Sequence, residues 1–187
     1  MGPVNLQHNG KLDLGCGDSK RPGFTGVDKF KTDSTDLLFD LLVFPWPIAS
    51  GSTDEIHCAN FFEHVPAKLR TSFMEEVHRV MKAGSKAVFI TPMFDRMFQD
   101  PTHEWPPIVP NSYLYWNQEW LKQNKLMHGS YVTSADFFMT FGYAVHPDFA
   151  KSEDEDGDDD EAEEKQRFAL LHYNNAISDL FTTLIKK

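Results

Sequence analysis

The stretch KLDLGCGDSKRPGFTGVDKF, residues 11–30, decides the fold prediction for this chain. A short apolar run, residues 11–14, is followed at once by Gly15 and Gly17, and a second apolar run ends in Asp28. Glycines adopt turn conformations that other residues avoid, and they let the backbone approach a ligand closely. The stretch therefore predicts a strand, a tight turn around a ligand, and a second strand that ends in a carboxylate.

The chain continues with alternating strand and helix patterns as far as residue 91. Further strands are predicted over residues 24–28, 35–41, 54–59 and 85–91, which are short and apolar. Between the last two strands, residues 66–84 repeat apolar side chains every three or four positions, so they predict a helix that begins at Pro66 and ends before Gly84. A strand, a helix and a second strand form a parallel βαβ unit. The predicted fold class is therefore α/β.

Residues 92–116 break this pattern, because they are rich in proline and aromatic residues without a clear period. A segment of this length and kind is usually a binding loop, so we interpret it as a substrate-side loop. Four of its aromatic residues either form an acceptor platform or fill the core beneath the loop: Trp105, Tyr113, Tyr115 and Trp116. A short helix over 117–128 and two long strands, 131–146 and 166–185, are predicted next. The two strands indicate a terminal antiparallel pair.

The length and charge of the chain limit the classes of function. With 187 residues the chain suits one domain, so we predict a single domain over residues 1–187. Ten of its 28 acidic residues lie between Glu153 and Glu164, and the others balance the 18 basic residues. A neutral body lacks the basic surplus that phosphate-backbone binding requires, which argues against a nucleic-acid substrate.

The acidic run, residues 152–164, is predicted to be a flexible insert. Residues 152–163 approximate the spacing of a calcium loop, but Ser152 replaces the leading aspartate and Asp159 stands where an apolar residue is usual. We therefore prefer a solvated loop to a calcium site.

The two cysteines, Cys16 and Cys58, predict buried, reduced thiols, as in a cytosolic protein. No apolar run approaches the ~20 residues of a membrane span, and the first residues do not resemble a signal peptide. We therefore expect a cytoplasmic protein without a membrane contact.

The glycine turn and the carboxylates after the strands predict a nucleoside-containing ligand. In an open parallel sheet, ligands bind beyond the carboxyl ends of the strands. There Asp28 can accept hydrogen bonds from ribose hydroxyls, and Asp40, which ends residues 35–40, can meet an adenine amino group. A dinucleotide-binding fingerprint would need glycine at position 20, where this chain has Lys20, so NAD is disfavoured.

Three segments in order carry a resemblance to a known family. Residues 11–28, 44–66 and 73–93 resemble the class I S-adenosylmethionine-dependent methyltransferases, and above all a small subgroup with a Gly-Cys-Gly turn, a short Pro-Gly loop and a Val-Asp strand end. The resemblance implies a Rossmann-like sheet, mostly parallel with a terminal antiparallel strand pair and helices on both faces. It also implies S-adenosylmethionine as methyl donor, a small-molecule or glycan acceptor, and a phage or bacterial source.

The resemblance implies a role for each matching position. Asp13 lies near the ammonium group of the methionine portion, Asn60 and Phe61 border the sulfonium, and Glu63 with His64 matches the Glu-His pair of the family. The implied cofactor-binding set is Asp13, Gly15, Cys16, Gly17, Asp28, Lys29, Asp40, Leu41, Asn60, Phe61 and Glu63.

Methyl transfer from a sulfonium is an in-line displacement, so it depends mainly on alignment of donor and acceptor. A general base is needed only when the acceptor arrives protonated, and His103 and His64 are the candidates. For His103, a hydrogen bond to the loop backbone remains an open alternative; for Glu63 we prefer a capping or orienting role. Met93 and Phe94 are expected to contact the acceptor. No metal is expected.

One departure from most class I enzymes is that residues 18–25 are too few for a helix between the glycine turn and the second strand. The far side of the pocket would then be closed by the 92–116 loop or by a partner subunit in a homodimer. Two alternative functions remain open. One is a catalytically silent S-adenosylmethionine-binding module that acts with a partner protein, and the other is an NAD(P)-linked enzyme.

Overall fold

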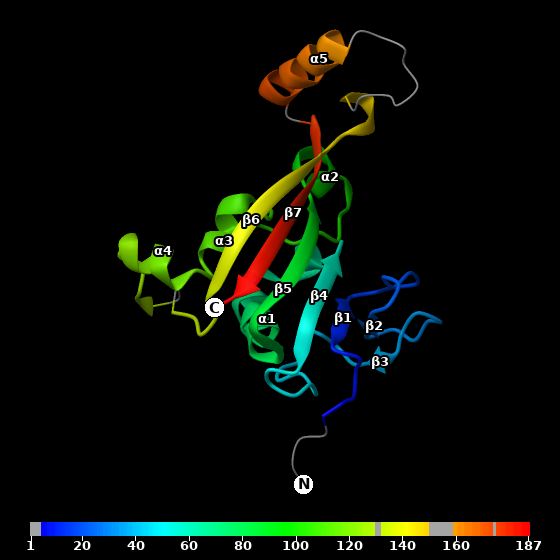
Figure 1. The fold of residues 1–187 in the computed structure, drawn as a ribbon, viewed down its shortest axis with the longest axis vertical. Helices are drawn as coiled ribbons and strands as arrows, with labels where there is room; N and C mark the ends of the chain where they lie inside the picture. The colour runs from blue at the N-terminus through cyan, green and yellow to red at the C-terminus, as the bar shows by residue number, and fades with distance from the viewer. Residues whose placement is uncertain (1–4, 130–131, 150–158, 174) are drawn as a thin grey trace.

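Seven strands form one mixed sheet in a computed structural model that describes residues 5–129, 132–149, 159–173 and 175–187 (Figure 1). The order of the strands across the sheet is β3-β2-β1-β4-β5-β7-β6, and β7 is antiparallel to both of its neighbours. The strands are β1 (Lys11–Leu14), β2 (Thr25–Asp28), β3 (Leu37–Leu38), β4 (Thr53–Ala59), β5 (Met81–Pro92), β6 (Phe137–Val145) and β7 (Ile177–Lys186). The predicted α/β class, with a mostly parallel sheet and a terminal antiparallel pair, is confirmed.

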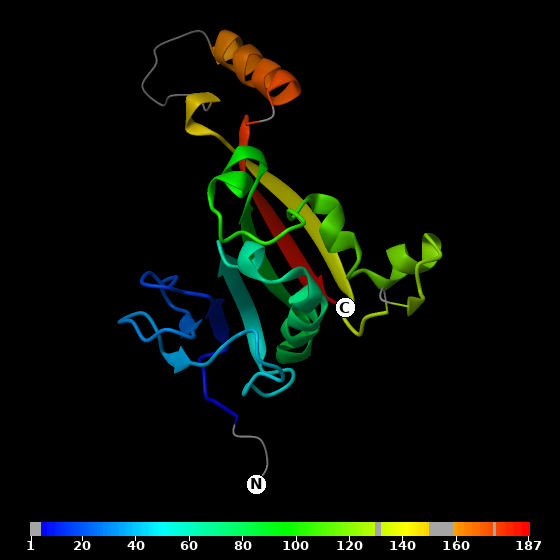
Figure 2. The same ribbon diagram turned by 180° about the vertical axis from the view of Figure 1, so that it is seen from behind.

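The helices are distributed unevenly around the sheet. Figure 2 shows α1 (Ala67–Val80), α2 (Phe94–Gln99) and α3 (Pro110–Leu114) in front of one face, whereas in Figure 1 no described helix lies in front of β4, β5 and β7. Along β5, Phe89 on the helix side is buried, and Val88 and Ile90 on the other side are only half-buried. Residues 15–24 between β1 and β2 contain no helix, as predicted, which leaves that face of the sheet thinly covered.

Helix α1 forms because its apolar stripe packs on the sheet. Phe73, Val77 and Val80 recur at helical spacing and are fully buried. The boundaries differ slightly from those predicted: Pro66 is the N-cap, and the helix ends at Val80. Gly84 therefore lies within β5, with φ +76°, near the point where the register of β5 against β4 shifts.

The prediction of a strand over residues 166–185 is wrong for its first part. Residues Asp159–His172 form α5, and β7 begins at Ile177. Strong helix formers dominate this segment, namely alanine, leucine, glutamate, lysine and glutamine. The apolar run 168–171 obscured this helix preference, because consecutive apolar residues also suit a strand. The predicted acidic insert lies partly outside the described residues, at 150–158, and continues into α5.

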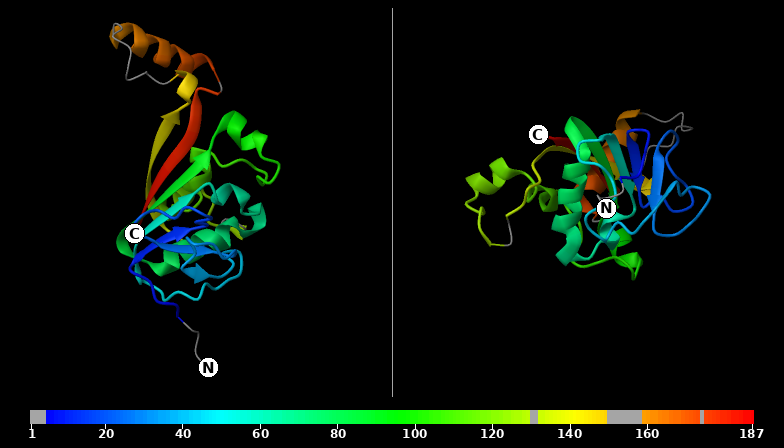
Figure 3. Two further views of the ribbon diagram at one scale, coloured as in Figure 1. Left: turned by 90° about the vertical axis from the view of Figure 1, so that its right-hand side faces the viewer. Right: turned by 90° about the horizontal axis from the view of Figure 1, so that it is seen from below.

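The antiparallel pair β6–β7 extends beyond the body of the molecule and carries α5 near its tip (Figure 3). A short 3-10 turn, η3 (Pro147–Phe149), follows β6. The helix predicted over 117–128 is present as α4, with the shorter bounds Gln118–Gln123.

The predicted loop 92–116 is more ordered than expected, because it contains α2 and α3. Its aromatic residues divide between the two alternatives of the sequence analysis. Tyr113 and Trp116 are buried in the core, where both contact Phe62. Trp105 is 73% exposed and Tyr115 is 39% exposed, so only these two are available at the surface.

Cys16 and Cys58 are both buried free thiols, as predicted. Among the described residues, no helix combines the length and the apolar character that crossing a membrane requires.

Candidate functional site

The candidate site lies at the carboxyl ends of β1 and β4, where the strand order reverses. From β1 the chain runs to β2 and β3 on one side of the sheet and then returns to β4 on the other side. Such a reversal opens a crevice between two neighbouring strand ends, where open α/β sheets bind their ligands. The glycine turn follows β1, and residues 60–64 follow β4, so both predicted segments meet here.

The glycine turn is tied to the end of β2. Gly15 and Gly17 both have positive φ, +68° and +52°, which L side chains rarely adopt. The Gly17 amide donates to Oδ2 of Asp28 at 3.0 Å, and the Phe30 amide donates to Oδ1. Each carboxylate oxygen keeps lone-pair capacity for a ligand, because an ionised carboxylate offers about four acceptor sites. Asp28 therefore holds the turn and retains acceptor capacity at the carboxyl end of β2.

Gly15 is in close contact with the segment after β4. A Cβ atom at Gly15 would lie 2.2 Å from the ring of Phe61, so the turn requires glycine for its space as well as its φ. Asn60, with φ +50°, directs the chain out of β4 at the same point. The structure thus brings together Gly15, Asn60 and Phe61, as predicted.

Asp13 is already occupied by protein partners. Its Oδ1 lies 2.7 Å from Nδ1 of His57 on the neighbouring strand, and its Oδ2 accepts the Arg21 amide at 2.7 Å. The side chain is buried, so it braces β4 and residues 15–24. His57 could not be recognised from the sequence, because the pairing of Asp13 with His57 depends on the register of β1 against β4.

Asp40 and Leu41 form the turn after β3. Oδ1 of Asp40 accepts the Leu42 amide at 2.9 Å, and the Asp40 carbonyl accepts the Val43 amide. Leu41 is buried, and its carbonyl accepts the indole N–H of Trp46 at 3.0 Å. The turn is well anchored, at the edge of the sheet beside β2.

Cys16 and Lys29, two further members of the predicted set, differ in accessibility. Burial raises the pKa of the Cys16 thiol to about 11, and its Sγ lies 3.6 Å from the Ser34 carbonyl. Lys29 is exposed and its ammonium lies over the ring of Phe30, 5.0 Å from the centroid. The Cys16 side chain therefore packs inside the turn, beside the Ser34 carbonyl.

A second group of titratable residues lies beside the crevice. Glu63 belongs to the 3-10 turn η1 (Phe62–His64) and has 0% exposure. Neither of its carboxylate oxygens has a hydrogen-bond partner in another described residue. Burial raises the pKa of Glu63 to about 7. A carboxylate is costly to bury without a partner, so this residue is the least satisfied polar group of the site.

His64 and His103 face each other next to Glu63, with ring centroids 4.8 Å apart. Nδ1 of His64 lies 3.2 Å from the Thr102 carbonyl and 3.1 Å from the Thr102 hydroxyl. Nδ1 of His103 lies 2.8 Å from the Met97 carbonyl. The backbone hydrogen bond considered for His103 is therefore present, and it leaves Nε2 available.

Arg70 holds this group together, although the sequence analysis gave it no role. Its buried guanidinium donates to the carbonyls of Val65, Glu104 and Pro106, at 3.0, 2.8 and 2.6 Å. The Glu104 amide also donates to the Glu63 carbonyl. Only the tertiary contact between α1 and residues 104–106 reveals this function, because Arg70 in isolation reads as a surface helix residue.

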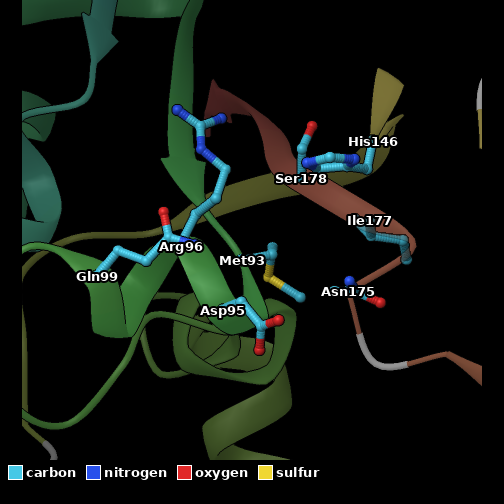
Figure 4. Close-up of a pocket in the computed structure, with 8 residues that line it drawn as sticks. All are labelled: Met93, Asp95, Arg96, Gln99, His146, Asn175, Ile177 and Ser178. Carbon is cyan, nitrogen blue, oxygen red and sulfur yellow. The ribbon is translucent and has the colours of Figure 1, made fainter. Parts of the chain in front are cut away.

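A small pocket opens beyond the end of β5 (Figure 4). Arg96 on its wall forms an ion pair with Asp179 of β7, with Nη1 2.6 Å from Oδ2. Met93, for which an acceptor contact is predicted, lines this pocket, and Phe94 is not among the lining residues. The lining residues are Met93, Asp95, Arg96, Gln99, His146, Asn175, Ile177 and Ser178.

Comparison with known proteins connects this fold to methyltransferases. No protein-family model matches the chain, and no curated protein matches it in sequence. Among solved structures, a SAM-dependent methyltransferase from Archaeoglobus fulgidus superposes with a TM-score of 0.61 at 16% identity, over 95% of this chain and 85% of that one.

Two further solved structures have the same architecture. One is geranyl diphosphate C-methyltransferase from Streptomyces coelicolor A3(2), in complex with Mg²⁺, geranyl diphosphate and S-adenosyl-L-homocysteine. It superposes with a TM-score of 0.53 at 12% identity, over 100% of this chain and 74% of that one. The other is a complex between the Haloferax volcanii Trm112 methyltransferase activator and a methyltransferase. It superposes with a TM-score of 0.54 at 14% identity, over 94% of this chain and 81% of that one. The chain thus has the Rossmann-like fold of these methyltransferases.

Proposed function

We propose that the chain transfers a methyl group from S-adenosylmethionine to an acceptor. The observation that carries the proposal is the Gly15–Gly17 turn, hydrogen-bonded to Asp28 at the point where the strand order reverses. Solved structures of the same fold contain the cofactor or its product: one geranyl diphosphate methyltransferase was crystallised with S-adenosylmethionine and the Streptomyces enzyme with S-adenosyl-L-homocysteine.

The crevice offers each part of the cofactor a suitable partner. The free lone pairs of Asp28 would accept the ribose hydroxyls, and the turn after β3, with Asp40 and the Leu41 amide, would meet the adenine. The positive-φ turn lets the methionine portion approach the backbone at Gly15 and Gly17. Phe61 and Asn60 would then border the sulfonium.

Transfer itself depends on alignment. The acceptor atom attacks the methyl carbon opposite sulfur, the C–S bond breaks with its electron pair left on sulfur, and the product is S-adenosyl-L-homocysteine. The acceptor, which we propose to be a small molecule or a glycan, would enter between residues 92–116 and the pocket lined by Met93 and Arg96. Glu63, whose pKa burial raises to about 7, and His103 would be the groups that receive an acceptor proton.

The test is incubation of the protein with S-adenosylmethionine labelled on its methyl group and with a metabolite and glycan extract. We expect label in one small fraction of acceptors. We expect none with Gly17→Val, because a β-branched residue disfavours the positive φ of Gly17 that the turn requires. Label in no fraction, despite measurable cofactor binding, would support the silent binding module in place of the enzyme.

A further inference from the structure

We propose that Glu63, His64 and His103 form a binding site for a divalent transition-metal ion. One ligand atom from each residue lies within 4.8 Å of the other two. The residues come from η1 and from the segment after α2, two parts of the chain that the sequence separates by about 40 positions. Two imidazoles and one carboxylate are a set that zinc and other first-row transition ions accept.

The state of Glu63 is the first argument for an ion. Its carboxylate is fully buried, and neither oxygen is hydrogen-bonded to another described residue. Buried charged groups are stable when they are paired or coordinate a metal. Arg96, whose charge acts on Glu63, is already paired with Asp179, and the guanidinium of Arg70 donates to backbone carbonyls. A bound cation would supply the partner that the protein does not.

The orientation of the two imidazoles is the second argument. The Met97 carbonyl can only accept, so Nδ1 of His103 carries the hydrogen and Nε2 of the neutral ring is bare. The Thr102 hydroxyl donates to Asp100 Oδ1 at 2.7 Å, so this hydroxyl and the Thr102 carbonyl both serve as acceptors for Nδ1–H of His64. Metal-binding histidines characteristically donate their other N–H to a carbonyl in this way.

The surrounding charge agrees with a cation. Oδ2 of Asp100 lies 3.8 Å from Nε2 of His103, the atom that would bind the ion. In a tetrahedral zinc site with bonds of about 2.1 Å, neighbouring ligand atoms lie about 3.4 Å apart. Loading would therefore draw the three ligand atoms closer than the 4.8 Å within which they now lie, and the Asp100 carboxylate would add negative charge beside the ion.

Three protein ligands leave one coordination position open for another molecule. An acceptor oxygen bound there would lose its proton more easily, and the resulting oxyanion could attack the methyl carbon while sulfur leaves with the C–S electron pair. This use of the ion rests on the proposed methyl transfer, whereas ion binding does not.

The test is titration of the untagged full-length protein with Co²⁺, followed by visible absorption, in millimolar Mg²⁺ to occupy oxygen-only sites. We expect one equivalent to bind with the absorption of nitrogen-coordinated cobalt, and Zn²⁺ to displace it. Affinity should fall by at least about tenfold in His64→Gln and in His103→Gln, because each removes one of three ligands. Asp100→Asn, at an exposed position, should give a smaller loss.

His172→Gln is the matched control, because Nδ1 of His172 also lies beside a backbone carbonyl, that of Phe168, but on α5. It should bind Co²⁺ like the wild type. Absence of binding, or equal binding in all four variants, would overturn the site. S-adenosyl-L-homocysteine binding is measured on the same wild-type sample. If the wild type binds Co²⁺ but not S-adenosyl-L-homocysteine, the result counts against the proposed function. If it binds S-adenosyl-L-homocysteine but not Co²⁺, the result counts against the metal site alone.

Discussion

At the scale of single residues, the site depends on a glycine that has two separate reasons to be glycine. Gly15 has a left-handed backbone, and the ring of Phe61 occupies the space of a Cβ atom. Gly23 has an even larger φ, +81°, but nothing within 4 Å of its missing Cβ. A comparison of substitutions at Gly15 and Gly23 therefore separates the effect of backbone strain from the effect of the steric clash with Phe61.

Gly15→Ala should destabilise the protein by roughly 3 kcal/mol, from the positive φ and from displacement of Phe61. Gly23→Ala, which incurs only the strain of the positive φ, should lose about 1 kcal/mol. Urea unfolding of both variants measures the difference in the free energy of unfolding. Equal losses would mean that Phe61 moves aside without cost.

The part of the site that depends on local geometry could be predicted from the sequence, whereas the part that depends on tertiary contacts could not. The glycine turn and Asp28 could be predicted because their geometry is set within residues 11–28. The partner of Asp13 could not be predicted, since His57 reaches Asp13 through strand register. The burial of the Glu63 carboxylate without a partner among the described residues could not be predicted either, because it results from the packing of the loop. His64 and His103 were recognised as chemically active, but their proximity needed the fold.

At the scale of elements, α1 organises the loop that completes the site. Arg70 bonds three backbone carbonyls, of Val65, Glu104 and Pro106, so it fixes residues 104–106 against the helix. The guanidinium fork suits three acceptors in different directions, which the ammonium of lysine cannot reproduce.

Arg70→Lys should lower the free energy of unfolding by about 2 kcal/mol, because buried carbonyls lose their donors. It should also speed amide hydrogen exchange at Glu104, whose N–H bonds the Glu63 carbonyl. Lys68→Arg, an exposed position on the same helix, is the control and should change neither quantity. Unchanged exchange at Glu104 in Arg70→Lys would show that the loop is held by other contacts.

Elements were predicted best where periodicity and burial agree. The stripe of α1 and the apolar runs of β4 and β5 face the core, and so their patterns identified them. The segment 166–172 was misread because a run of consecutive apolar residues suits a buried strand as well as a helix. The one-sided covering of the sheet follows from the short segment 15–24, which the sequence does show.

At the scale of the whole molecule, stability should depend on pH through buried neutral imidazoles. Nε2 of His78 on α1 is buried without a hydrogen-bond partner among the described residues, and its ring packs edge-on against Phe137. Burial lowers the pKa of His78 below its ordinary 6.5, and Lys186 lowers it further, while Asp136 opposes the shift. The folded protein thus binds a proton here less readily than the unfolded chain.

The contribution of His78 to stability should therefore fall as the pH drops through 6.5 toward the folded pKa of His78, because the unfolded state gains the proton first. His78→Gln should lose less stability than the wild type between about pH 7.5 and about pH 5.5. His8, whose pKa burial lowers, and Glu63, whose pKa burial raises, titrate in both proteins, so their effects cancel from the comparison. Thermal melts at the two pH values measure the effect, and identical losses would show that His78 accepts a proton in the fold.

The measurement that tests the central claim most directly is calorimetric titration with S-adenosyl-L-homocysteine. The wild type should bind, and Asp28→Ala should bind at least about tenfold more weakly, the loss expected when hydrogen bonds to a charged carboxylate are removed. Asp33→Ala, which replaces an exposed aspartate in the loop between β2 and β3, should bind like the wild type. Absence of binding by the wild type, or equal binding by Asp28→Ala, would contradict the assignment of this crevice to the methyl donor.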